Sequence, residues 1–219
     1  MSKSQTKLEP QGNGTWATGS MMEQLVPEIA LHVMSYLDYK SLCRLSMTNS
    51  VMRRAANDDR PWKVLYHKDF TTEQTQISPS NGWKAYYAAT KAVIDVNEDW
   101  YKVFRAKSLR GMSHIWLKAD YVKCIHPGGV VFTGYDKVLQ SWKIPFDWDQ
   151  QYNIHVHDVR VRVFGDNMAW VTLKEFVNAA VEPLLTTNIY EFHNGRWFMV
   201  HHHSSPIVDI DIIDPMVFL

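Results

Sequence analysis

The hydrophobic period of this chain changes once, and that change limits the fold more than any other feature. Up to Leu117 apolar residues recur at helical spacing, interrupted by short polar turns. Farther along, Val159, Val161 and Val163 alternate with arginines, as in a half-buried strand. Helices followed by an antiparallel meander predict an α+β fold.

Two local signals refine the strand region. Asn194-Gly195 lies between two apolar segments, which is the strongest short signal for a tight hairpin. Ile154 and Val156 are apolar at even numbers, whereas Val159 and its successors are apolar at odd numbers. A strand cannot change faces without an extra residue, so we predict a bulge near His157-Asp158.

The composition excludes several classes of function. The formal net charge is zero and no basic run is present, so nothing predicts a nucleic-acid partner. We find no apolar stretch long enough for a membrane span and no signal peptide, which predicts a protein of the nucleus or cytoplasm without a membrane partner. Cys43 and Cys124 stand in unrelated contexts and fit buried thiols in a reducing compartment.

The polarity of successive segments suggests the domain organisation. Residues 1–21 are predicted to be a disordered polar tail, and residues 22–70 a domain of short helices. A linker and connecting helix follow over 71–92, then a second domain over 93–207 and a tail over 208–219.

Turn and cap residues divide the first domain finely. Pro27 suits the first turn of a helix, and Asp38 and Ser50 are predicted N-caps. Asp59 with Pro61 indicates the start of a further helix.

The segment "PEIALHVMSYL", residues 27–37, carries more apolar surface than one small core requires. As a helix it spreads its apolar residues over roughly 220° of the circumference, against a little over ~100° for a helix lying on one core. A domain of about 50 residues has little capacity to cover the excess itself. We therefore expect a second polypeptide, or the second domain, to cover it.

The whole stretch from Leu25 to Tyr66 resembles an F-box. The matching residues are Leu25, Pro27-Glu28-Ile29, Tyr36-Leu37, Leu42, Leu45-Ser46, Arg53 and Trp62-Lys63. Thr48-Asn49-Ser50 departs from the usual pattern, which affects the third helix and not the first.

This resemblance implies docking on a Skp-type adaptor that is joined to a cullin in an SCF (Skp–cullin–F-box) ubiquitin ligase. An apolar helix face placed in a groove would make the contact. The expected adaptor-binding residues are Leu25, Pro27, Ile29, Val33, Leu37, Leu42 and Leu45.

Residues 93–207 resemble an NTF2-like, SnoaL-like domain. The resemblance depends on paired helices, "IHPGG", the spacing of Gly134, Val138 and Trp142, and the closing histidines. It implies a cone formed by a curved antiparallel sheet with packed helices. F-box followed by SnoaL-like domain is the architecture of a small plant family of Skp-interacting F-box proteins.

Three residues test whether the cone resembles the steroid isomerases of this superfamily. His126 stands where their carboxylate base stands, while Trp100 and a position near Thr187 replace their oxyanion donors. Because two of the three roles are altered, we expect no catalytic residues. We interpret His126 as a structural histidine whose ring bonds the backbone of its own turn.

The run "HHHSS" suggests a metal site only at first sight. On a strand, His201 and His203 share one face and His202 points to the other. At most two of the three histidines could therefore join one site, whereas zinc requires three or four ligands. We expect no metal site and no other cofactor. The pairing set by the Asn-Gly turn would place His201 and His203 on the face of Trp197 and Met199, where one of them would hydrogen-bond in a pocket or at a subunit contact. The sequence does not decide which face of this strand lines the cone. Cys124 with His126 is a weak candidate for a nucleophile, since a strand cysteine here would be buried.

We expect a non-catalytic, target-recruiting subunit of the ligase, with the second domain binding a target protein or a small ligand. Two alternatives remain, namely a small-molecule enzyme or sensor tethered to the ligase, and a dimerisation hub formed as a homodimer through the sheet. The candidate pocket residues are Trp100, Tyr121, His126, Trp142, His201 and His203.

Overall fold

The computed structural model describes residues 26–70, 77–178, 180 and 182–207. The predictions for the tails at 1–21 and 208–219 fall outside these residues, as does Leu25. The chain divides into two compact units, Met1–Pro61 and Trp62–Leu219. The sequence places this division later, after residue 70.

The first unit contains three short helices: α1 (Pro27–Met34), α2 (Tyr39–Leu45) and α3 (Ser50–Ala56). Both α1 and α2 pack against α3. Pro27 begins α1, where its missing N–H costs nothing. The expected N-cap Asp38 accepts a hydrogen bond from the Ser41 N–H at 2.8 Å.

The cap of α3 differs from the sequence prediction. Asn49, not Ser50, accepts the hydrogen bond from the Met52 N–H at 2.8 Å, and Ser50 is the first helical residue. Either residue type can cap a helix, so composition alone could not place this boundary to one residue.

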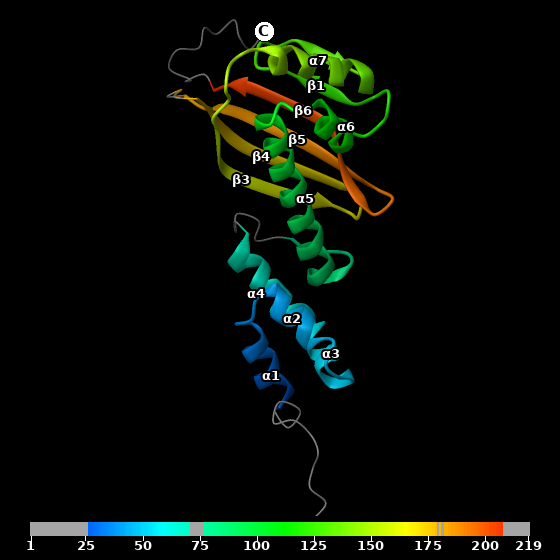
Figure 1. Cartoon of the computed structure of the whole chain (residues 1–219). Helices are drawn as coiled ribbons and strands as arrows, with labels where there is room; N and C mark the ends of the chain where they lie inside the picture. The colour runs from blue at the N-terminus through cyan, green and yellow to red at the C-terminus, as the bar shows by residue number, and fades with distance from the viewer. Residues whose placement is uncertain (1–25, 71–76, 179, 181, 208–219) are drawn as a thin grey trace, which may run out of the picture. The chain divides into compact units, whose positions relative to one another are not determined.

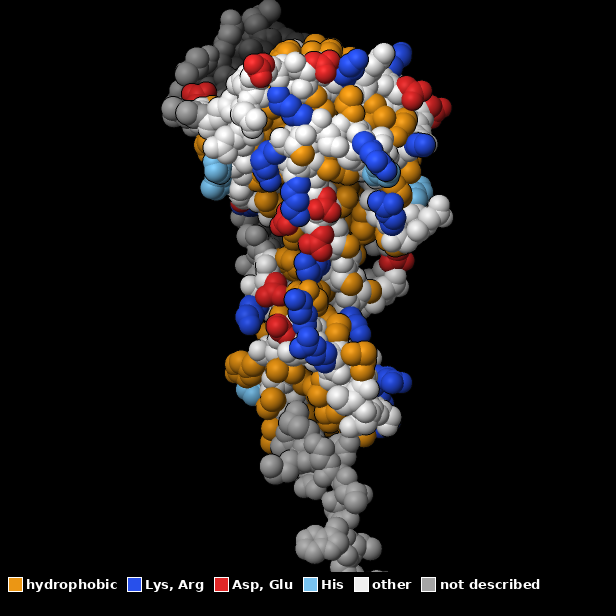
Figure 2. Space-filling view, viewed as in Figure 1, with side chains coloured by type: hydrophobic (Ala, Val, Ile, Leu, Met, Phe, Trp, Pro, Cys, Tyr) orange, Lys and Arg blue, Asp and Glu red, His pale blue; other side chains and the backbone are white. Residues whose placement is uncertain are grey.

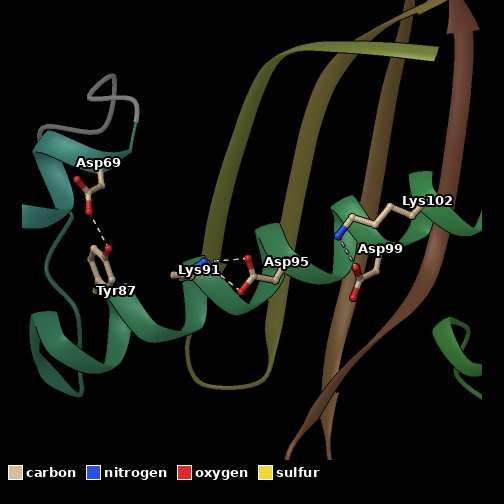
Figure 3. Close-up of polar contacts among 6 residues, drawn as sticks. All are labelled: Asp69, Tyr87, Lys91, Asp95, Asp99 and Lys102. Carbon is tan, nitrogen blue, oxygen red and sulfur yellow. Dashed lines mark hydrogen bonds and ion pairs between the residues drawn. The ribbon is translucent and has the colours of Figure 1, made fainter. Parts of the chain in front are cut away.

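The second unit begins within α4 (Asp59–Asp69), because the aromatic face of this helix packs on α5 (Gly82–Arg105). The rings of Tyr66 and Trp83 have centroids 5.4 Å apart, and those of Phe70 and Tyr87 lie 5.0 Å apart. Tyr87 also donates a hydrogen bond to Asp69 at 2.7 Å (Figure 3).

Two ion pairs lie on the solvent face of α5. Lys91 pairs with Asp95, and Lys102 pairs with Asp99, each at 2.9 Å (Figure 3). Such exposed pairs add only a few tenths of a kcal/mol each, about 0.3–0.5 for i,i+4 spacing. The opposite face of α5 is buried, which is what holds the helix in place.

The remaining elements form one six-stranded sheet with helices against it (Figure 1). They are α6 (Leu109–Ile115), β1 (Lys123–Ile125), β2 (Val131–Thr133), α7 (Tyr135–Asp147), β3 (Ile154–Phe164), β4 (Met168–Val177), β5 (Leu184–His193) and β6 (Arg196–Pro206). The strand order is β2-β1-β6-β5-β4-β3. This confirms the predicted cone, except that β1 runs parallel to β6, so the sheet is mixed and not wholly antiparallel.

Two bulges shape the sheet. The predicted one is confirmed, since the β3–β4 register shifts between His157 and Arg160, and Asp158 has a φ of 55°. A second shift, missed from the sequence, lies in the β5–β6 pair, where Tyr190 faces Met199 but Ile189 faces His201. Val200 is therefore the extra residue, and the strand changes faces there.

The core of the second unit lies on the side of the sheet that α5, α6 and α7 cover (Figure 1). Its fully buried side chains include Trp100, Trp116, Val138, Val171, Leu173, Tyr190 and Met199. Among the described residues, no helix is both long and apolar enough to cross a bilayer.

Candidate functional site

The first helix keeps part of its apolar surface exposed. Ile29 is 51% exposed and Val33 is 39% exposed, while Ala30, Leu31 and Met34 are buried. Pro27 is exposed as well. Figure 2 shows hydrophobic side chains on the visible surface of this helical unit. The described structure thus leaves the outer aliphatic face of α1 available to a partner.

The other expected adaptor contacts differ in accessibility. Leu37 and Leu45 are half-buried. Leu42 has no exposed surface, so its side chain belongs to the core of the helical unit and cannot meet a partner in this conformation. The prediction for Leu42 is therefore wrong as a contact residue. Leucines that build a small core and leucines that bind a partner are alike in sequence, so only burial separates them.

A cavity of about 620 Å³ opens inside the second unit. Its walls come from α5, the turn after β1, α7 and the inner faces of β3, β4, β5 and β6. Most lining residues are aromatic or aliphatic, and the polar ones are few. The lining includes Trp100, Phe104, His126, Phe132, Ser141, Trp142, Ile144, Trp148, Tyr152, Glu175, Val177, Leu184, His202 and Ser204.

Three of the six predicted pocket residues lie in this cavity, and three do not. Trp100, His126 and Trp142 line it. Tyr121 is 50% exposed and donates its hydroxyl hydrogen to Glu191 at 2.7 Å, away from the cavity. His201 and His203 lie on the opposite face of the sheet, because the bulge at Val200 reverses the alternation of β6.

His202 takes the place that the sequence assigned to its neighbours. Its ring stacks on Trp100 with centroids 4.9 Å apart and meets Trp142 at 5.4 Å. The signal that could have revealed this is the run Trp197-Phe198-Met199-Val200, in which apolar residues do not alternate with polar ones. Adjacent apolar residues in one strand indicate either a strand covered on both faces or a bulge.

A chain of buried amides holds His202. Asn97 of α5 accepts hydrogen bonds from the Asn188 amide and the Tyr190 hydroxyl, both at 2.9 Å. This arrangement turns the Asn188 carbonyl toward His202, whose Nδ1–H donates to it at 2.7 Å. The network satisfies polar groups that would otherwise be costly to bury.

A second buried group surrounds Glu175, which sequence reasoning missed. Its carboxyl group accepts hydrogen bonds from the Tyr101 hydroxyl and, at 3.3 Å, from the Ser204 hydroxyl. Burial raises the pKa of Glu175, although these hydrogen bonds act in the other direction. Glu175 continues the alternation of Val171 and Leu173, so it faces inward by position despite its charge.

The ring of His126 is held by another element, contrary to the prediction that it bonds its own turn. Its Nε2 lies 2.9 Å from the Ser141 hydroxyl of α7. The Ser141 hydrogen is given to the Val138 carbonyl at 2.8 Å, so the serine oxygen accepts and Nε2 of His126 carries the proton. Cys124 lies 3.7 Å from the same nitrogen, but it is fully buried and burial raises the pKa of its thiol, which opposes a reactive thiolate.

The isomerase-like positions do not converge. Trp100 and His126 line the cavity, but Thr187 lies on the outer face of β5 opposite His203. The indole N–H groups of Trp100 and Trp142 are enclosed and make no hydrogen bond among the described residues, so they are unsatisfied donors that a molecule in the cavity does not reach in this conformation. Within the described ranges, no three metal-ligating side chains form a metal-binding cluster.

The buried state of His202 predicts a pH dependence of stability. Burial above all, and then the positive charge that His126, His201 and His203 acquire in acid, lower its pKa to about 3. The unfolded chain takes up this proton near pH 6.5, whereas the folded chain does so only near its lowered pKa. The contribution of neutral His202 to the free energy of unfolding is therefore fully present above pH 6.5 and is lost as the pH falls toward 3.

Urea unfolding at pH 7 and pH 5 measures this effect. Between these values the unmodified chain is expected to lose about 2 kcal/mol more of its unfolding free energy than the His202→Phe variant does. The difference between the two proteins cancels the titration of groups that they share, Glu175 included. Equal losses in both proteins would show that His202 titrates normally in the folded chain.

Taken together, the observed features define the class as a short-helix unit with an exposed aliphatic face, followed by an NTF2-like cone. The F-box-like family matches residues 25–68, and the SnoaL-like domain family matches residues 93–209. The chain belongs to the plant F-box proteins that carry a C-terminal SnoaL-like domain. An F-box implies binding of a Skp-type adaptor.

Individual relatives agree with this assignment. F-box protein SKIP8 of Arabidopsis thaliana is 60% identical over 186 residues, which cover 85% of this chain and 80% of that protein. A probable F-box protein of the same plant is 50% identical over 115 residues, covering 52% of this chain and 94% of that protein.

A solved structure supports the fold of the second unit alone. A putative dehydratase from the NTF2-like family, from Streptomyces avermitilis, is similar with a TM-score of 0.52 and 24% identity. The similarity covers 56% of this chain and 98% of that one.

Proposed function

We propose that this protein is a target-recruiting subunit of an SCF ubiquitin ligase. The exposed aliphatic face of α1, centred on Ile29 and Val33, is the observation that supports this most directly. Placed in an adaptor groove, each such side chain contributes roughly 1.5–3 kcal/mol. The adaptor would in turn connect the chain to a cullin, and the protein would act in the nucleus or cytoplasm.

In this proposal the SnoaL-like domain is a binding module for a target protein or a small ligand, without chemistry of its own. The positions that correspond to isomerase catalysis support this, because Thr187 lies outside the cavity that His126 and Trp100 line. An enzyme or sensor tethered to the ligase is the alternative, and it would use the same cavity.

Reconstitution tests the proposal. The purified full chain is mixed with a Skp-type adaptor and the mixture is passed over a size-exclusion column with mass detection. We expect a complex containing one copy of the adaptor for each copy of the chain. Separate elution of the two proteins at micromolar concentration would contradict the assignment as an SCF subunit.

The outer face of the sheet supports a second proposal, a homodimer. Large apolar side chains are exposed there on neighbouring strands, namely Phe164, Met168, Trp170 and Leu185. Trp170 stands in one cross-strand row with Arg162, Ile189 and His201. Exposed apolar clusters of this kind are typical of interaction surfaces. His201 and His203 would then lie in the subunit contact.

The substitution Trp170→Glu is expected to convert this dimer into a monomer, because it removes a large exposed apolar side chain from the proposed contact and would bury a carboxylate there. Light scattering of the full chain over a range of concentrations measures the mass. Val131→Glu, which changes an exposed apolar residue on the edge strand β2, is the matched control and should leave the dimer intact. A monomeric unmodified chain would rule out this second proposal.

A further inference from the structure

The cavity inside the SnoaL-like domain has no charged wall. Among its described lining residues there is no lysine, arginine or aspartate, and Glu175, His126 and His202 are the groups that could carry a charge near neutral pH. Burial favours the uncharged form of each, since it raises the pKa of Glu175 and lowers those of both histidines. An ionised ligand would lose its hydration without gaining an opposite charge.

The aromatic side chains in the cavity walls favour ligands that contain rings. Trp100 and Phe104 stack with an interplanar angle of 17°, and Trp142 meets His126 edge-on at 4.6 Å. Trp148 and Tyr152 add further aromatic surface. A flat apolar molecule can stack on such faces or meet their edges, and each well-placed aromatic contact adds affinity beyond that of the buried area.

The two histidines supply the polar contacts that remain. His202 gives its Nδ1 hydrogen to Asn188, so its Nε2 carries a lone pair and no proton. Nε2 makes no hydrogen bond within the described part of the chain. His126 has the opposite tautomer, since its Nε2–H donates to the Ser141 hydroxyl oxygen and its Nδ1 carries no proton.

These tautomers leave one bare acceptor nitrogen on each of the two histidines. The Glu175 oxygens are already occupied by Tyr101 and Ser204, which leaves the histidine nitrogens as the better acceptors for a ligand. An acceptor held in an apolar cavity favours a partner that brings its own hydrogen.

We propose that this cavity binds an uncharged, ring-containing small molecule whose hydroxyl group donates a hydrogen bond to Nε2 of His202. The proposal deepens the ligand-binding role suggested above and rests on it, but it does not depend on adaptor docking. Recruitment of a target and binding of such a ligand would then occur in one subunit.

Three naphthalene derivatives of similar size test the proposal by titration calorimetry on the full chain. They are 2-naphthol, which has a hydroxyl donor, 2-methoxynaphthalene, which has none, and 2-naphthoate, which is anionic. The naphthol is expected to bind about fivefold more tightly than the methoxy compound, the effect of one neutral hydrogen bond. The naphthoate should bind at least about tenfold more weakly than the naphthol.

Variants locate the site. In His202→Phe the ratio of the affinities for naphthol and the methoxy compound should fall to about one, whereas His203→Phe, on the other face of β6, should keep the ratio of the unmodified chain.

A second variant tests the cavity itself. Ile144 lies at the cavity with 56% of its surface exposed, so Ile144→Trp should obstruct the cavity without disturbing the core. The neighbouring exposed Lys143 does not line the cavity, and Lys143→Trp is the matched control.

Nitrogen NMR of the unmodified chain provides a measurement that does not depend on how the variants fold. The Nε2 resonance of His202 should have the position of an unprotonated ring nitrogen and should shift on addition of naphthol. The proposal is overturned by equal affinity for naphthol and its methyl ether, by a preference for naphthoate, by a protonated Nε2, or by no saturable binding. Adaptor binding, measured separately, should be unchanged by Ile144→Trp, so failure of this proposal is distinguishable from failure of the SCF assignment.

Discussion

Replacing Ile29 and Val33 together by aspartate is expected to lower the affinity for a Skp-type adaptor by roughly a thousandfold. Both side chains are exposed in the free chain, so the substitutions remove little from the core of the helical unit. In the complex, however, each aspartate would be buried in an apolar groove without a partner, which adds a desolvation penalty to the lost apolar contact.

The control for this experiment uses the same substitutions elsewhere. Val131→Asp with Ile144→Asp changes one exposed valine and one exposed isoleucine of the SnoaL-like domain, and it should leave adaptor binding unchanged. Circular dichroism should show equal helix content in all three proteins. If the Ile29 and Val33 double variant is folded and still binds at the original affinity, the exposed face of α1 is not the adaptor contact.

Truncation of Trp100 to alanine is expected to destabilise the SnoaL-like domain by about 3–5 kcal/mol. The ring is only 2% exposed and lies against Phe104, Trp142 and His202. Removing it leaves a hole on the wall between α5 and the sheet, and the loss is large compared with the usual total of about 5–15 kcal/mol for a domain.

Urea unfolding measures this loss. Trp148, which is 55% exposed, is the matched control, and Trp148→Ala should cost about 1 kcal/mol or less. Trp100→Phe should cost less than Trp100→Ala because it keeps an aromatic ring on the cavity wall. A cost of Trp100→Ala no greater than that of the control would mean that Trp100 is not part of the packed core.

Several features of the fold follow from local patterns in the sequence. The shift from even to odd apolar positions required the bulge before Arg160, and the β3–β4 register shows it there. Asn194 and Gly195 have φ angles of 50° and 81°, as a hairpin with both central residues in the left-handed region requires. Each of these patterns lies within a few consecutive residues, so the sequence there is sufficient to predict the local backbone geometry.

The candidate site was harder to predict because its residues depend on distant partners. His202 was not among the predicted pocket residues, since the bulge at Val200 has no polar residue to mark it. Glu175 was passed over because its charge suggested solvent, yet Tyr101 and Ser204 provide hydrogen bonds for it in the interior. A buried polar side chain is identified by its partners, and these come from elements far apart in the chain.

The sequence by itself determined the order of helices and strands, the F-box and SnoaL-like domains, and the surplus of aliphatic residues on the first helix. Only the tertiary structure decided which of these aliphatic residues remain exposed, and that Leu42 does not. It also decided which histidine of the run faces the cavity and which ring nitrogens there are bare. The physical reason is that hydrophobic period is encoded residue by residue, whereas burial and protonation depend on neighbours that only folding brings together.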